Sequence, residues 1–181
     1  MISKRAVSIM IGYVLLVTAA IVMGVIVYQW LKTYVPIEVP ECPQETSVFI
    51  KDYSCEPALG YFNITLKNNG KFNVAGYFIH VANKSGQEIA TIDLSNYVRS
   101  GGMWAGNAVV FVAGSDNAMS PGEEIKSAFL NLTEAGFGQI YLVEIIPTRF
   151  QEIKNKLTFV SCGNAKIRER INDANCVFEI P

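Results

Sequence analysis

An uninterrupted apolar stretch opens the chain directly after two basic residues. No charged residue occurs from position 6 to position 31. As an α-helix rising about 1.5 Å per residue, this stretch would be about 39 Å long, which exceeds the roughly 30 Å hydrocarbon core of a bilayer. Apolar residues lie on every side of such a helix, unlike those of an amphipathic surface helix. The pattern predicts a membrane-spanning helix over residues 7–35.

The residues that flank the apolar stretch predict its orientation. Lys4 and Arg5 precede it and a single lysine, Lys32, follows closely, so the positive-inside rule places the N-terminus in the cytoplasm. A conventional secretory signal peptide has an apolar core of about 7–15 residues and a small-x-small cleavage site. This run is longer and ends in V-Y-Q-W-L-K-T-Y, with aromatic residues where a helix meets the membrane–water interface. We therefore expect a single-pass membrane protein whose C-terminal domain is extracellular.

Small residues interrupt the apolar stretch at two places. Ser8 with Gly12, and Ala20 with Gly24, have the small-xxx-small spacing that lets helices approach closely. At about 100° per residue, Gly24 lies about 160° around the helix from Ser8, so the four residues do not form one stripe. They suit a helix with neighbours on several sides, although glycine and alanine are also common in membrane helices in general. The spacing leaves both interpretations open.

Beyond the apolar stretch, the hydrophobic period changes to two. Three prolines, at positions 36, 40 and 43, break the helix and predict an extended linker over residues 36–45. Residues 62–67 alternate strictly, and in residues 75–81 the apolar Tyr77, Ile79 and Val81 share one face, with His80 on the other. Further strands are predicted at residues 47–53, 89–94, 109–113, 124–132, 139–147, 157–161 and 166–171.

Turn signals separate these short strands, and no helical pattern of 10–15 residues lies between them. The sequence therefore predicts an immunoglobulin-like antiparallel β-sandwich over residues 46–181. With the N-terminal helix, the fold class is α+β: one long hydrophobic helix followed by an all-β domain.

Four cysteines occur, and all of them follow the apolar stretch. An even number in an extracellular segment predicts two disulfides, with four unrelated buried thiols as the alternative. Zinc is disfavoured because there is no CxxC pair and the only histidine is far from every cysteine in the sequence. Three pairings are open, and we favour Cys42–Cys162 with Cys55–Cys176, which would staple the first strand to the last ones.

Composition and motifs do not indicate catalysis. The net charge is −1 and the fifteen basic residues are scattered, so the chain lacks the basic surface of a nucleic-acid binder. The motifs GxxxxGK[ST], GxGxxG, HExxH and GxSxG are absent from the sequence. The adjacent Glu123 and Glu124 fall in a turn signal, which explains them better than a catalytic pair does. We expect no enzymatic activity, no cofactor and no metal site.

Three surface features complete the sequence-based picture. N-glycosylation sequons begin at Asn63, Asn83 and Asn131. The glycine-rich residues 99–108 predict a mobile loop, with a contact site for a neighbouring subunit as the alternative. Residues 166–170 alternate charged and apolar side chains, which predicts an exposed edge strand protected by charge.

The N-terminal sequence K-R-A-V-S-I-M-I-G-Y-V-L-L resembles the start of archaeal type IV pilin precursors, whose pattern is close to R-A-V-S-P-V-I-G-x-x-L-L. The resemblance covers about the first thirty residues. The chain departs from it at Ile9, where proline is usual, and at Tyr13, where a smaller aliphatic residue is common. The matching residues are Arg5, Ala6, Val7, Ser8, Ile11, Gly12, Leu15 and Leu16.

This resemblance implies processing and assembly. A prepilin peptidase would cut between Ala6 and Val7, removing a leader of residues 1–6 and keeping the helix. The protein would then be a structural subunit of a pilus-like surface filament, stored in the lipid bilayer. Its implied partners are further copies or other pilins, a pilus assembly ATPase and a membrane platform. The alternative is a non-polymerising, single-span surface protein, either an archaellum accessory of stator-like type or one associated with an S-layer.

Overall fold

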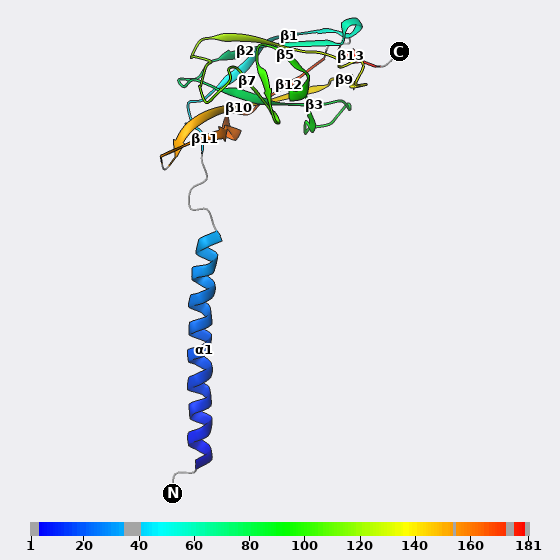
Figure 1. Ribbon diagram of the computed structural model, residues 1–181. Coiled ribbons are helices and arrows are strands. Elements are labelled where there is room, and N and C mark those ends of the chain that lie inside the picture. The colour runs from blue at the N-terminus through cyan, green and yellow to red at the C-terminus, as the bar shows by residue number, and fades with distance from the viewer. Residues whose placement is uncertain (1–3, 35–40, 154, 173–175, 180–181) are drawn as a thin grey trace. The chain divides into compact units, whose positions relative to one another are not determined.

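The structure, a computed structural model, describes residues 4–34, 41–153, 155–172 and 176–179. The chain divides into two units, Met1–Val39 and Pro40–Pro181. The described part of the first unit is one helix, and the described strands all belong to the second (Figure 1). This arrangement confirms the α+β class with a single N-terminal apolar helix and a β-sandwich.

The helix α1 spans Lys4–Tyr34, so it begins earlier than the predicted residue 7. Its segment Met10–Tyr34 has a mean hydropathy of 2.6 and is long and apolar enough to cross a membrane. Every side chain of this segment is exposed in the isolated chain. The helix forms without tertiary contacts because an apolar run that satisfies its own backbone hydrogen bonds is stable in lipid.

The first sheet of the second unit has four strands in the order β1-β2-β8-β5. All neighbours in it are antiparallel. Its strands are β1 (Val48–Glu56), β2 (Tyr61–Asn68), β8 (Glu124–Phe129) and β5 (Val98–Ser100).

The second sheet has seven strands, with a main order of β11-β10-β3-β7-β6. These are β11 (Lys156–Ser161), β10 (Leu142–Ile153), β3 (Gly76–Ala82), β7 (Ala108–Val110) and β6 (Met103–Ala105). In addition, β12 (Ile167–Arg170) pairs with β10, and β4 (Ile92–Asp93) pairs with β3. A small separate sheet joins β13 (Val177–Phe178) to β9 (Gly138–Gln139). Short 3-10 turns are Pro57–Leu59, Ser95–Tyr97 and Gly163–Ala165.

The strand orders match the immunoglobulin arrangement. The order β1-β2-β8-β5 corresponds to strands A-B-E-D, and β3-β10-β11 corresponds to C-F-G. The hairpin β6–β7 is an addition beside β3. The chain forms this hairpin after β5, so the order of these strands along the sequence departs from the immunoglobulin pattern.

The core lies between the two sheets and follows from the alternation in the sequence. Along β2 the buried side chains are Phe62, Ile64 and Leu66, with their neighbours half-buried. Along β3 the buried residues Tyr77, Ile79 and Val81 form the predicted face, while His80 is half-buried on the other side. Each strand thus contributes one apolar face to a shared core.

The structure corrects the prediction for the glycine-rich segment. Residues 99–108 are not a mobile loop, because they contain the end of β5, all of β6 and the turn that leads into β7. Between β2 and β3, which lie in different sheets, the amide of Gly70 donates to Ser47 O and to Asn68 Oδ1. Very short strands such as β5 and β6 carry too few residues to show a period of two.

We expect Phe129→Ala to lower the free energy of unfolding by about 3–5 kcal/mol. Phe129 is fully buried in β8, and its ring centroid lies 6.1 Å from that of Phe62, so truncation leaves a cavity between the sheets. Urea unfolding of the full chain in detergent micelles, followed by near-UV circular dichroism, measures the loss. Phe159→Ala, at a side chain 37% exposed, is the matched control, with a loss of about 1 kcal/mol or less. Equal losses for the two variants would contradict the assignment of Phe129 to the core.

Candidate functional site

The surface of α1 is a continuous exposed apolar area. Side chains from Met10 to Tyr34 are exposed around the whole circumference. Apart from the helix's own nearby backbone, a Cβ atom added at Gly12 or Gly24 would meet no atom within 4 Å, so both positions are open to a neighbouring helix. Ala20 is exposed as well, whereas only the backbone of Ser8 is described. Three of the four predicted small residues, Gly12, Ala20 and Gly24, therefore lie on the accessible surface of the helix.

The hydroxyl groups of the two threonines in α1 are bonded to the helix itself. The hydroxyl of Thr18 donates to Leu15 O at 3.0 Å, and that of Thr33 donates to Gln29 O at 3.1 Å. Such bonds to a preceding turn leave no unpaired hydroxyl proton in an apolar environment. The two threonines are compatible with lipid or with a helix-packed interior.

The C-terminal end of α1 carries an aromatic cluster. The ring centroids of Trp30 and Tyr34 lie 4.7 Å apart, and Lys32 Nζ lies 5.7 Å from the ring centroid of Tyr28. Aromatic rings with a nearby lysine are typical of the membrane–water interface. The geometry agrees with the predicted far end of the membrane segment.

The residues predicted to direct processing lie at the start of α1. Lys4, Arg5, Ala6 and Val7 belong to its first helical turns, and only their backbone is described. Nothing in the structure tests cleavage between Ala6 and Val7, which stays a prediction from the resemblance.

Two disulfides connect the N-terminal part of the β domain to its C-terminal part. Cys42 is bonded to Cys162 and Cys55 to Cys176, and in each pair the Cα atoms lie 5.1 Å apart. This is the pairing that the sequence analysis favoured. Cys162 follows β11 directly and Cys55 lies near the end of β1, so the bridges join the first part of the domain to its last part. They differ from the immunoglobulin disulfide, which links strands B and F.

The asparagine side chains of the three sequons differ in hydrogen bonding and in solvent exposure. Asn63 Nδ2 donates to Ser54 Oγ at 3.3 Å from a half-buried position, and Asn83 Nδ2 donates to Phe137 O at 3.3 Å. Asn131 is exposed, its φ is 63°, and its side-chain amide has no hydrogen bond within the described residues. Asn131 is therefore the most accessible of the three.

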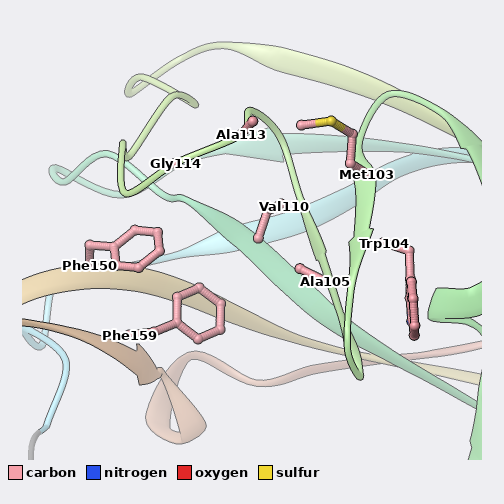
Figure 2. Close-up of a pocket in the computed structure, with 8 residues that line it drawn as sticks. All are labelled: Met103, Trp104, Ala105, Val110, Ala113, Gly114, Phe150 and Phe159. Atoms are coloured by element: carbon pink, nitrogen blue, oxygen red, sulfur yellow. The ribbon is translucent and has the colours of Figure 1, made fainter.

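An apolar hollow of about 330 Å³ lies on the outward face of the seven-stranded sheet. The rings of Phe150 and Phe159 lie side by side on β10 and β11 with centroids 4.9 Å apart (Figure 2). Figure 2 also shows Met103 pointing toward Ala113 on the opposite wall. Every lining residue is uncharged: Met103, Trp104, Ala105, Val110, Ala113, Gly114, Phe150 and Phe159.

Charged groups gather elsewhere on the same sheet. Glu144 in β10 is 6% exposed, and its Oε2 accepts a hydrogen bond from Arg168 Nε at 2.6 Å with Lys166 Nζ at 3.6 Å. His80 lies opposite Glu144 on the other side, in register with Asp93 beyond it. The carboxylate of Glu144 is thus paired with two cations, Arg168 and Lys166. Within the described residues, no cluster of His, Cys, Asp and Glu side chains could hold a metal ion.

Glu123 directly precedes β8 and Glu124 begins it, and each makes its own structural contacts. Lys51 and Lys67 both contact the carboxylate of Glu124, and their hydrogen bonds lower its pKa below the ordinary value. Glu123 Oε2 accepts a hydrogen bond from the amide of Ser120 at 2.8 Å. Each carboxylate thus has its own partners, and the two are not arranged as an acid–base pair.

Sequence reasoning missed the hollow and the strand at its edge. Two signals could have found them. Gly106-Asn107 is a two-residue hairpin connection, and positions 100–115 contain no charged residue. Read together, they indicate an uncharged hairpin rather than a loop.

Comparison with protein-family models and with curated proteins yields no match to this chain.

Proposed function

We propose that this protein is a structural subunit of an archaeal type IV pilus-like surface filament. The observation that carries the proposal is the combination at the N-terminus. A basic–small–apolar junction at Arg5, Ala6 and Val7 leads directly into a helix that is apolar and exposed on every side. A simple anchor needs the apolar helix but has no use for a processing junction before it.

The helix suits two successive environments. In lipid, its backbone bonds are satisfied internally and its two threonines are bonded to the preceding turn. In a filament, the same apolar surface packs against sister helices, which can approach closely at Gly12 and Gly24. Identical subunits that repeat head-to-tail produce an open helical assembly rather than a closed ring.

The β domain is proposed to lie outside the cell and to decorate the filament. Its two disulfides fit an oxidising compartment. Its sequons would carry glycans, first of all at the exposed Asn131. The N-terminus would remain cytoplasmic until cleavage, by the positive-inside rule. The peptidase, assembly ATPase and membrane platform of the family are the partners that this function requires.

N-terminal sequencing of the protein from native membranes or shed filaments tests the proposal. We expect a mature chain that begins at Val7, because the peptidase removes the basic leader and leaves the helix intact. Electron microscopy of the same preparation should show filaments that contain the chain. A mature chain that begins at Met1, with no filaments, would instead favour the static single-span surface protein.

A further inference from the structure

The strand β6 forms an open edge of the seven-stranded sheet. Within the described residues it pairs with β7 alone, with Ala105 opposite Ala108 and Trp104 opposite Val109. In a two-residue hairpin the closing pair is hydrogen-bonded, and bonded pairs alternate along antiparallel strands. The backbone N–H and C=O of Trp104 therefore point away from β7, toward the open edge.

This edge is held in place by close contacts beneath it. Gly101 has a φ of 72°, and a Cβ atom there would collide with the carbonyl oxygen of Lys126. A Cβ atom at Gly102 would collide with Cγ1 of Val109. The backbone of Gly101 and Gly102, directly before β6, is thus packed against β8 of one sheet and β7 of the other. These contacts fix β6 in an extended conformation before any partner binds. Little conformational entropy is then lost on pairing.

The edge lacks the usual protection against pairing with another strand. Trp104 is 58% exposed and Met103 is 43% exposed, and no charged residue occurs at positions 100–115. By contrast, the exposed strand β12 carries Arg168, Glu169 and Arg170. Natural edge strands use such charges to prevent edge-to-edge association. An uncharged edge beside an apolar hollow is therefore suited to strand addition.

We propose that β6 is a self-pairing edge, at which a second copy of this chain adds its own β6 in antiparallel orientation about a two-fold axis. The N–H and C=O of Trp104 in each copy would bond to Trp104 of the other. In this register, Met103 of one copy lies opposite Ala105 of the other. Both residues line the hollow, so a large side chain meets a small one on each side of the axis.

This self-complementarity is what identifies a second copy as the partner. A two-fold contact requires one surface to satisfy itself, and β6 offers unpaired backbone, no repelling charge and a large–small alternation around its central residue. The strand is short, so the contact is weak between free molecules. Anchoring two copies in one membrane, with the two-fold axis along the membrane normal, raises their effective concentration and makes the contact sufficient. The contact is separate from helix packing and does not depend on N-terminal processing.

A charge-swap experiment on the full chain in detergent micelles tests the proposal. Trp104→Lys should weaken dimerisation, measured by sedimentation velocity, by about tenfold or more, because two lysines then face each other where two aromatic rings were buried. Trp104→Glu alone should have the same effect. An equimolar mixture of the two variants should recover dimers, because the opposed charges then attract. Ile89→Lys and Ile89→Glu, at a side chain 62% exposed in the segment between β3 and β4, are the matched controls and should leave dimerisation unchanged.

A second variant keeps the test decisive if Trp104→Lys alters the near-UV circular dichroism. Ala105→Lys changes an exposed residue and should weaken dimerisation by a similar factor, because it occupies the place of Met103 from the other copy. Wild-type chains that stay monomeric at a protein-to-detergent ratio that places two copies in one micelle would overturn the proposal. So would a dimer whose association constant is unchanged by all these variants, since its contact would then lie elsewhere.

Discussion

A chain carrying Ala6→Trp is expected to keep its leader, so that all of the protein recovered from membranes begins at Met1. Under the proposed function, the peptidase binds the small residue before the scissile bond, and an indole ring in its place blocks the cut. An uncut chain retains Lys4 and Arg5 at the start of α1. Two charges at that end of an otherwise apolar helix would be costly to bury in a filament core. N-terminal sequencing and electron microscopy measure the two consequences, which are loss of processing and loss of filaments.

The control for this prediction places the same ring elsewhere in the leader. Ile2→Trp adds an indole four positions before Ala6 and leaves the basic–small–apolar junction intact. It should be cut between Ala6 and Val7 like the natural chain. Equal cleavage of both variants would show that the junction does not direct processing, and the proposed function would lose its main support.

Replacing Cys55 and Cys176 together by alanine is expected to lower the free energy of unfolding by about 2–5 kcal/mol. The two residues are 121 positions apart, so the bridge strongly restricts the unfolded chain. Cys176 is also fully buried within the main core, and its loss loosens the contact between the C-terminal segment and β9. Against a typical stability of about 5–15 kcal/mol, this loss is large. Urea unfolding of the full chain in micelles measures it.

Two further variants serve as comparisons for the loss of the Cys55–Cys176 disulfide. Ser54→Ala changes the exposed neighbour of Cys55 and should cost about 0.5 kcal/mol or less. Replacing Cys42 and Cys162 removes a bridge of nearly the same span, 120 positions, from a smaller cluster. If losing the Cys55–Cys176 bridge cost no more than Ser54→Ala, the bridge would not be a stabilising element of the domain.

Several features of the fold could be predicted because their signals are local. The helix α1 follows from one apolar run, which needs no partner to be helical in lipid. The inward faces of β2 and β3 follow from a strict period of two, confirmed at Phe62, Ile64, Tyr77 and Ile79. The charged edge at β12 was also predicted, because charges that alternate along a strand can only be solvated or paired.

Other features could not be predicted because they depend on contacts distant in the sequence. The apolar hollow draws Met103 from β6 and Phe159 from β11, and only the order of strands in the sheet brings these residues to one face. Glu144 is likewise paired with Arg168 on β12 and with Lys166 just before that strand, and only the strand order brings these residues together. A single sequence does not show which strands are adjacent in a sheet, so it cannot predict contacts between residues on those strands.

The sequence by itself thus determined the helix, the two-sheet class and the faces of the longer strands, because hydrophobic periodicity acts within a few residues. It also favoured the disulfide pairing that the structure contains, because a staple between the first and last strands suits a small extracellular domain. Only the tertiary structure decided that residues 103–105 form an open, uncharged edge. A three-residue strand has almost no periodicity of its own, and its place is set by the sheet against which it packs.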